Sequence, residues 1–447
     1  MDIFEERKRK RREVFCPLCG GALEKSDDVW ACTDCFKRFE MSLKQIGVPV
    51  HEAAKPYVHF DAALLDQREA EPVCNGEAEK TKQGILDVLS DYDVQGAEIR
   101  SVHRGPTVTQ YNVSFPFYVD LSKITELEPQ FSISLRMGQV RVFLNYEEGC
   151  VTVEVPNRER RFPALGGMLS EDTYKRAPKS SLLFALGKNM AGKEVYGDIS
   201  KMIHMLVAGS PGSGKSIFIH SMLVSLLYRY SPEELRLILI DPKRIEFDAY
   251  NGLPHLATEK VVCEPREALK ALDWAIKEMD RRYRLIDSFG RRTESFVVNV
   301  DQYNEKVEKA DRLPKILIVI DELADLMLVE QRELENKVQS LAQKSRAAGI
   351  HLVLATQRPA KDVVTDAIRG NMPTRIAFAV PSETDSRTVL EHEGAQKLLG
   401  RGDMLYTMMG MSTPTRMQCA YVSDAEICRV VEFIKENNET FPILIKD

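Results

Sequence analysis

The stretch Gly209-Ser-Pro-Gly-Ser-Gly-Lys-Ser216 decides the fold of this chain, and it directly follows the apolar run Met202–Ala208. Its spacing fits the phosphate-binding pattern G-x-x-x-x-G-K-[ST] in the setting that the pattern requires: a strand, a glycine-rich turn and a helix. The helix is predicted over Ile217–Leu227, because no helix breaker occurs before Ser231-Pro232. A glycine turn that arose by chance is the alternative, and the flanking strand and helix make it the weaker interpretation.

The residue types within this loop indicate how a nucleoside triphosphate would bind. Glycines let backbone N–H groups wrap around phosphates, and the helix N-terminus adds a partial positive charge. Lys215 is expected to neutralise the β- and γ-phosphates, and the Ser216 hydroxyl to bind Mg²⁺. We therefore predict ATP and Mg²⁺ as ligands. The predicted nucleotide-binding residues are Gly209, Ser210, Pro211, Gly212, Ser213, Gly214, Lys215, Ser216 and Ile217.

Two further apolar runs end in residues suited to hydrolysis. Ile316–Ile320 leads into Asp321-Glu322, and carboxylates at the carboxyl end of a buried parallel strand face the ligand crevice. Asp321 is predicted to hold Mg²⁺ through water, and Glu322 to orient or deprotonate the attacking water. The alternative is a pair of acidic residues that caps the next helix. Ile350–Thr356 ends beside Gln357, which is predicted to sense the γ-phosphate or the attacking water.

Alternating strands and helices predict the fold class. Further strands are expected at Leu235–Ile240, Arg375–Val380 and Met417–Val422. Apolar residues recur at helical spacing between Pro265 and Gly290, and a last helix is expected over Asp424–Asn437. This order predicts an α/β domain with a mostly parallel sheet that helices cover on both faces.

Several longer motifs, in this order and spacing, resemble the motor domain of the FtsK/SpoIIIE family of double-stranded DNA translocases. The resemblance covers roughly residues 83 to 436. Leu323 stands where the family usually has Phe, and Pro211 lies inside the phosphate loop; neither departure removes a charged or liganding group. The motifs are Asp241-Pro-Lys243, Pro254-His-Leu256, Lys277–Tyr283, Asp321–Met327, Leu341–His351, Leu354–Pro359, Pro373–Phe378, Asp385-Ser-Arg387 and Leu398–Leu405.

The resemblance implies a RecA-like P-loop ATPase that forms a ring, expected to be a hexamer, and pumps duplex DNA through a central channel. Each active site would lie between subunits, with an arginine of the neighbour stabilising charge on the transferred phosphoryl group. Arg346 is the candidate finger, and Arg375 is a weaker sensor candidate. The alternative for Arg346 is a surface residue paired with Glu333 or Glu335.

The net charge of −6 at first argues against DNA binding, because DNA is itself negatively charged. A ring motor answers this by placing a few cations in its channel rather than over its whole surface. The alternative for each candidate is ordinary surface solvation. The candidates are Arg291, Arg292, Lys361 and Arg369.

Residues 83–188 resemble the smaller α domain of the family, and residues 189–447 make up the motor domain. Alternating runs predict strands at Val108–Val113, Gly138–Phe143 and Val151–Asn157, with a helix over Ile124–Arg136, hence an α+β module. In the family this domain forms a second tier of the ring. The segment Ala185–Gly192 is the expected crossing between tiers.

Four cysteines near the amino end form two C-x-x-C pairs. Two such turns complete a tetrahedral thiolate site, so residues 14–45 are predicted to be a structural zinc ribbon. A redox dithiol or a disulfide pair is the alternative. Residues 1–13 form a basic tail and residues 46–82 a linker, and the ribbon would contact DNA or a protein partner. The predicted zinc ligands are Cys16, Cys19, Cys32 and Cys35.

Length and hydropathy frame the remaining expectations. The 447 residues suit about three domains. No apolar stretch approaches the ~20 residues of a membrane span, and no signal peptide is apparent, so we expect a soluble cytoplasmic protein without a membrane anchor. The family's winged-helix γ domain is also not expected after the last helix, which would leave the motor undirected or oriented by the ribbon or a partner.

Two other functions remain open from the sequence. One is a protein-translocating ATPase of the type VII secretion kind, which shares this motor ancestry; DNA-stimulated hydrolysis would separate the two. The other is a DNA clamp that uses ATP only to assemble its ring. Intact Lys215, Asp321 and Glu322 weigh against a clamp.

Overall fold

The computed structural model describes residues 56–67, 76–146, 148–178 and 181–445, together with the backbone of four short strands near the amino end. These strands are β1 (Val14–Phe15), β2 (Ala22–Ser26), β3 (Val29–Cys32) and β4 (Arg38–Phe39), and they pair antiparallel in that order.

The ends of these strands bear on the predicted zinc ribbon. Phe15 pairs with Ala22 and Cys32 pairs with Leu23, so the strands that lead into the two cysteine pairs end at the same edge of the sheet. The cysteines at 16, 19 and 35 lie outside the described residues, as does the basic tail over residues 1–13. The zinc site therefore stays a prediction.

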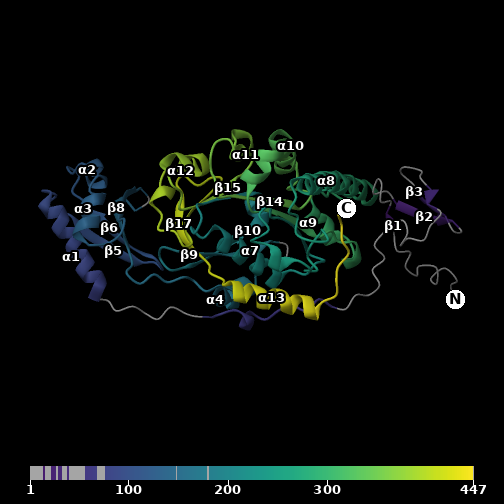
Figure 1. Ribbon diagram of the computed structural model, residues 1–447, viewed down its shortest axis with the longest axis horizontal. Helices are drawn as coiled ribbons and strands as arrows, with labels where there is room; N and C mark the ends of the chain where they lie inside the picture. The colour runs from purple at the N-terminus through teal and green to yellow at the C-terminus, as the bar shows by residue number, and fades with distance from the viewer. Residues whose placement is uncertain are drawn as a thin grey trace.

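The smaller domain is an antiparallel sheet with helices on one side. Its sheet has the order β5-β6-β8-β7, and Ile85, Phe131 and Val153 share its core. The helix expected over residues 124–136 is two short helices. The elements are α1 (Gly76–Asp91), β5 (Glu98–Arg104), β6 (Val108–Ser114), α2 (Leu121–Thr125), α3 (Glu128–Ser134), β7 (Arg141–Asn145) and β8 (Cys150–Pro156). Figure 1 shows this domain at one end of the molecule.

The larger domain is built on a nine-stranded sheet of order β10-β9-β17-β16-β15-β11-β14-β13-β12. The five strands from β15 to β12 are parallel, and β16, β17, β9 and β10 are added antiparallel. The strands are β9 (Leu183–Asn189), β10 (Glu194–Asp198), β11 (Met205–Ala208), β12 (Leu235–Ile240), β13 (Lys315–Ile320), β14 (Ile350–Thr356), β15 (Thr374–Phe378), β16 (Asp403–Met408) and β17 (Thr415–Cys419).

The prediction of a mostly parallel sheet is therefore wrong for the antiparallel half. Tight turns at Gly192 (φ +76°) and Gly410 (φ +94°) join β9 to β10 and β16 to β17. So short a connection permits only antiparallel pairing, whereas a parallel pair needs a long crossover.

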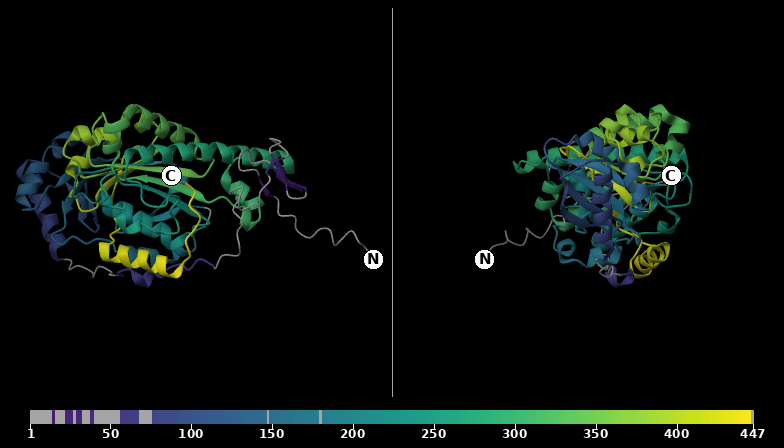
Figure 2. Two further views of the ribbon diagram at one scale, coloured as in Figure 1. Left: turned by 45° about the vertical axis from the view of Figure 1, so that its right-hand side comes forward. Right: turned by 90° about the vertical axis from the view of Figure 1, so that its left-hand side faces the viewer.

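Helices cover both faces of this sheet, as the sequence predicted. Along β13, Leu317 and Val319 face a core shared with α7, α4 and α13, whereas Ile318 faces a core shared with α8 and α10. Figure 2 shows α13 and α8 on opposite sides of the strands. The longer helices are α7 (Lys215–Arg229), α8 (Pro265–Thr293), α10 (Leu323–Lys344) and α13 (Asp424–Asn437). The shorter ones are α4 (Leu165–Ser170), α5 (Asp172–Lys175), α6 (Ile199–Met202), α9 (Val300–Lys306), α11 (Asp366–Gly370) and α12 (Glu383–Leu390).

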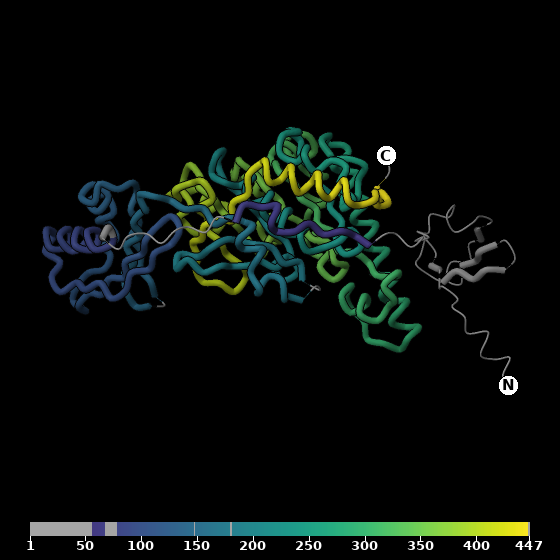
Figure 3. Tube along the Cα trace, turned by 90° about the horizontal axis from the view of Figure 1, so that it is seen from below, coloured from purple at the N-terminus to yellow at the C-terminus, as the bar shows by residue number. Residues whose placement is uncertain are grey.

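The packing divides the chain at places that differ from the predicted boundaries. Leu165 and Phe184 share a hydrophobic core with Phe218, so residues from α4 onward pack with the larger domain. The segment expected to cross between tiers is the β9–β10 hairpin. Residues 56–67, expected to be linker, lie against α13 (Figure 3), and the Val58 N–H donates to Asn438 Oδ1 at 2.7 Å.

Two ion pairs between described residues join the two domains, and the one made by Arg416 is buried. Arg416 on β17 pairs with Glu154 on β8 of the smaller domain and, at 2.6 Å, with Asp403 on β16. Lys397 reaches Glu128 at 2.8 Å. Among the helices of the described ranges, none is long and apolar enough to cross a membrane.

Candidate nucleotide-binding site

The phosphate loop connects the carboxyl end of β11 to the start of α7. Gly212 (φ +75°) and Gly214 (φ +110°) adopt left-handed backbone conformations that glycine tolerates. A Cβ on Gly214 would lie 2.3 Å from the backbone nitrogen of Gly402, so the loop also needs glycine for close approach. Gly214 caps α7 without a side-chain hydrogen bond. The first N–H groups of this helix are thus available to an anion.

Lys215 and Asp321 meet beneath the loop. Lys215 Nζ donates to Asp321 Oδ1 at 2.7 Å and to the Asp321 carbonyl oxygen at 2.9 Å, and both side chains are buried. Burial raises the pKa of Asp321, and Lys215 partly opposes that shift. The second carboxylate oxygen, Oδ2, is buried and has no hydrogen-bond partner among the described residues.

That free oxygen fits a hydrated magnesium ion. Mg²⁺ keeps several waters and is usually held by one or two protein oxygens plus substrate phosphates. Asp321 Oδ2 would accept a hydrogen bond from such a water, and Ser216 offers the hydroxyl. No group of three or more His, Cys, Asp or Glu side chains in the described ranges would hold a metal by itself.

Glu322 lies at the junction of β13, α10 and β14. Its Oε1 accepts from the Thr356 hydroxyl at 2.7 Å, and its Oε2 accepts from the Gln357 N–H at 3.1 Å. It also caps α10 through the Ala324 N–H at 3.3 Å, so the helix-capping role weighed from the sequence is present for this residue. Lys243 lies 3.4 Å from Oε2. The Glu322 carboxylate is therefore buried and held beside the end of β14, next to Gln357.

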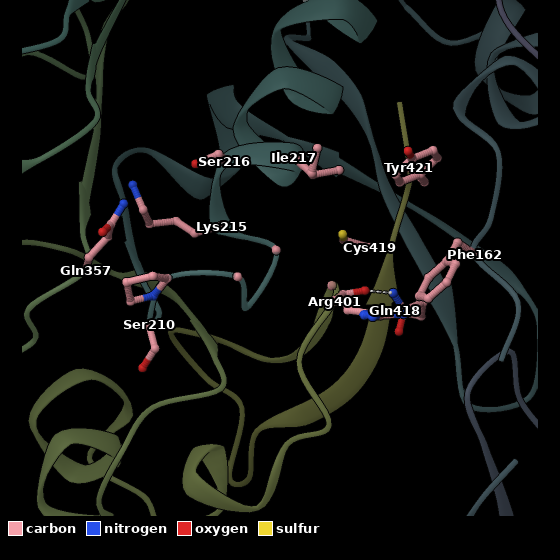
Figure 4. A pocket seen from close by; sticks show the side chains of 14 residues that line it. Phe162, Ser210, Lys215, Ser216, Ile217, Gln357, Arg401, Gln418, Cys419 and Tyr421 are labelled. Atoms are coloured by element: carbon pink, nitrogen blue, oxygen red, sulfur yellow. Dashed lines mark hydrogen bonds between the residues drawn. The ribbon is translucent and has the colours of Figure 1, made fainter. Parts of the chain in front are cut away.

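A cavity of about 410 Å³ opens over the loop. All predicted loop residues except Gly209 and Ser213 line it, and so does Gln357. Sequence reasoning missed its other wall, because that wall is assembled from the antiparallel half of the sheet and the segment before α4. Figure 4 shows this wall facing the loop, and its residues are Phe162, Arg401, Gly402, Gln418, Cys419 and Tyr421.

Sequence reasoning also missed Glu246, which follows β12. Ser216 Oγ donates to Glu246 Oε1 at 2.7 Å. The neighbouring His220 and Ser216 lower the pKa of Glu246 to about 2, so the side chain is ionised. Its only signal in the sequence was its place just after the Asp241-Pro-Lys243 motif.

The two arginine candidates lie near the amino-terminal ends of β14 and β15, at the end of the sheet opposite the phosphate loop. Arg346 is in the turn between α10 and β14, and it is exposed and forms no ion pair with a described residue. The two carboxylates considered as its ion-pair partners have other contacts: Glu333 lies 3.1 Å from Lys337, and Glu335 accepts a hydrogen bond from the Thr365 hydroxyl. Because β14 starts beside Arg346 and ends at the nucleotide site, Arg346 is remote from its own phosphate loop.

Arg375 is held by its own chain at the start of β15. Its Nη1 lies 3.0 Å from Glu391, and its Nε donates to the Met372 carbonyl oxygen at 3.1 Å. These contacts account for the residue structurally.

The predicted DNA contacts lie in two separate places. Arg291 pairs with Asp287, and the Arg292 guanidinium lies 5.9 Å from the Phe289 ring, both at the end of α8. Lys361 is exposed in the loop after β14, and Arg369 on α11 pairs with Asp366. Figure 1 shows α11 over the middle of the sheet and the long α8 extending toward its edge.

Together the fold and the site define a class. A glycine loop follows β11, acidic residues follow β13, and β14 separates the two strands; this arrangement is that of a P-loop ATPase. The FtsK/SpoIIIE family profile matches residues 169–361, and the FtsK alpha domain profile matches residues 61–157. The chain belongs to the FtsK/SpoIIIE family.

Curated relatives agree with this assignment. The chain is 45% identical over 356 residues to the DNA translocase FtsK of Clostridium tetani, covering 79% of this chain and 47% of the relative. It is also 45% identical over 360 residues to the DNA translocase FtsK of Caldanaerobacter subterraneus, covering 80% and 49%. The chain thus spans about half the length of the curated relatives it matches.

Solved structures share the fold. The pCW3 conjugation coupling protein TcpA, solved with ATPγS, superposes with a TM-score of 0.54 at 22% identity. The match covers 79% of this chain and 99% of TcpA. The cytoplasmic domain of the type VII secretion ATPase EccC of Thermomonospora curvata gives 0.52 at 22% identity, covering 61% of this chain and 33% of that one. At this level of identity the likeness concerns the fold alone.

Proposed function

We propose that this chain is an ATP-driven translocase of double-stranded DNA. The observation that carries the proposal is the 45% identity to DNA translocases across both domains, in a chain whose phosphate loop, Asp321 and Glu322 are intact and assembled. A relative that had lost motor activity would be free to lose the buried Lys215–Asp321 pair. This chain retains it.

In the proposed reaction the chain's own residues bind ATP and activate water. Loop N–H groups and Lys215 bind the phosphates, which draws Lys215 toward the nucleotide from Asp321. Ser216 and, through a water molecule, Asp321 would hold Mg²⁺, and the ion would supply charge stabilisation on the phosphate oxygens. Glu322 accepts a proton from a water molecule as the water oxygen attacks the γ-phosphorus. The bond between the γ-phosphorus and the bridging oxygen breaks, and ADP and phosphate are released.

We further propose that the active site is completed by a neighbouring copy in a ring, expected to be a hexamer. Arg346 supports this, because it is exposed, lacks an ion pair within the described ranges and lies at the amino end of β14, remote from the phosphate loop of its own chain. An arginine with these properties is free to reach the active site of a neighbouring copy and stabilise charge there. In such a ring, duplex DNA would pass near the exposed loop that carries Lys361.

The amino-terminal strands carry a separate proposal, a structural zinc site formed by Cys16, Cys19, Cys32 and Cys35. Support comes from the spacing of the two pairs and from the shared sheet edge at which β1 and β3 end. Elemental analysis of the purified chain should find about one zinc per subunit. Loss of that zinc in the C16S/C19S double variant is expected, and a zinc-free wild-type chain would contradict the proposal.

The first test is steady-state ATP hydrolysis with and without linear duplex DNA, with Lys215→Ala as the inactive control. Strong stimulation by duplex, absent from the variant, is expected of a DNA motor. Hydrolysis indifferent to DNA would contradict the proposal and direct attention to a protein substrate. No loss of function in Glu322→Gln would instead indicate a clamp that uses ATP only for assembly.

A further inference from the structure

The loop after β12 carries Glu246, and hydrogen bonds to the Asp241 carboxylate fix the backbone of this loop. Asp241 is fully buried at the end of β12, and its two oxygens accept the backbone N–H groups of residues 243–247 at 2.9–3.1 Å. A carboxylate that accepts so many N–H groups fixes the path of the backbone. Phe247 is buried and anchors the far end of the loop. The backbone of Glu246 is therefore rigid where its side chain turns toward the phosphate loop.

The Glu246 side chain makes a direct contact with the predicted magnesium ligand. Ser216 Oγ donates its single hydrogen to Glu246 Oε1 at 2.7 Å. A serine hydroxyl has one hydrogen and two acceptor lone pairs, and its hydrogen rotates freely unless an acceptor holds it. With the hydrogen held by Glu246, the lone pairs of Ser216 Oγ are left for a cation.

A second contact holds the other carboxylate oxygen. His220 Nε2 lies 3.5 Å from Glu246 Oε2, and His220 Nδ1 lies 2.9 Å from the Tyr250 hydroxyl. The His220 ring also stacks on Tyr250, with 5.7 Å between ring centroids. Since His220 is on the same helix as Ser216, Glu246 is gripped by two side chains of α7 and by its own rigid loop.

We propose that Glu246 is a positioning residue for magnesium, which orients the Ser216 hydroxyl so that its lone pairs face the ion. The proposal rests on the proposed ATPase function and adds to it, because neither the phosphate loop nor the acidic pair after β13 contains this residue. In this structure Asp321 is engaged by Lys215, so Glu246 is the carboxylate that contacts Ser216. Partners of metal ligands commonly affect metal affinity by about 10–100-fold.

The test measures binding of a fluorescent ADP analogue without DNA, in EDTA and across a titration of MgCl₂. Glu246→Ala should lower the Mg²⁺ affinity of the nucleotide complex by about 10–100-fold and leave nucleotide affinity in EDTA unchanged. Glu246→Gln keeps an acceptor oxygen for Ser216 and should lose less. Glu264→Ala is the matched control, because Glu264 is an exposed carboxylate that pairs with Arg244 of the same loop and does not contact Ser216.

A double-mutant cycle with Ser216→Ala separates orientation from general electrostatics. Once the hydroxyl is gone, Glu246→Ala should cause no further loss of Mg²⁺ affinity. Additive losses, an unchanged Mg²⁺ affinity in Glu246→Ala, or an equal loss in EDTA would each overturn the proposal. A wild-type chain that binds no nucleotide would contradict the proposed ATPase function as well, whereas normal wild-type binding with an unaffected variant would contradict the role of Glu246 alone.

Discussion

The buried ion pair between the two domains gives the sharpest test of the packing. Arg416 is the cation between Glu154 and Asp403, and the side chains of all three are at most 4% exposed. Burial alone would lower the pKa of Arg416, but the two carboxylates raise it. Burial likewise pushes the pKa of Glu154 upward, yet Arg416 and Arg141 bring it below its ordinary value.

Replacing Arg416 with Met should leave two buried carboxylates without their main partner. Removal of one member of a buried pair costs about 3–5 kcal/mol, which corresponds to a fall in Tm of roughly 10 °C. Scanning calorimetry at pH 7.5 measures the shift. The added substitutions Glu154→Gln and Asp403→Asn should recover part of it, because they remove the uncompensated charges.

A surface pair supplies the control. Arg176 and Asp172 are also 2.6 Å apart, but their side chains are 81% and 72% exposed. Exposed pairs contribute less than about 1 kcal/mol, so Arg176→Met should hardly change the Tm. Equal shifts in Arg416→Met and Arg176→Met would refute the reasoning that burial, and not distance, sets the energetic importance of the domain contact.

Three further predictions concern the active site and the core. Arg346→Ala should abolish hydrolysis by itself and regain activity when mixed with Lys215→Ala, since each variant supplies what the other lacks; no complementation would contradict a trans finger. Tyr421→Ala should raise the KM for ATP about tenfold with kcat little changed, because Tyr421 lines the cavity over the phosphate loop and offers a ring on which the adenine base can stack; an unchanged KM would place the base elsewhere. Burial lowers the pKa of His204 and His255 to about 3 and of His351 to about 4. These rings stay neutral in the folded state while the unfolded chain takes up protons below about pH 6.5, so each contributes stability above that pH and loses about 2 kcal/mol of it by pH 5; equal Tm values at pH 7.5 and 5 would contradict this.

The parts of the site that depend on local sequence could be predicted, and those that depend on distant contacts could not. The phosphate loop carries its own glycines and lysine, and the strands before Gly209 and Asp321 are continuous apolar runs, so their roles follow from neighbours in the chain. Gln418 and Phe162 have no such local pattern. They reach the cavity because β17 pairs with β16 and β9, and because the segment before α4 bridges to Tyr421.

The fold shows the same division. The parallel half and the helices that start at Pro265 and Asp424 follow from periodicity and capping residues. The segment Ala185–Gly192 was expected to cross between the domains, but it lies in the β9–β10 hairpin. The strand β17, with which β9 pairs, is more than two hundred residues away in the chain. Glu246 was missed for a related reason: its importance arises from Ser216, which lies on a different element.

The most direct test of the central claim is displacement of a third strand from a triplex by this chain on linear duplex DNA. The account predicts that the wild-type chain displaces the strand in an ATP-dependent manner from DNA of arbitrary sequence, and that Lys215→Ala and Glu322→Gln do not. ATP hydrolysis stimulated by duplex without any displacement would contradict translocation.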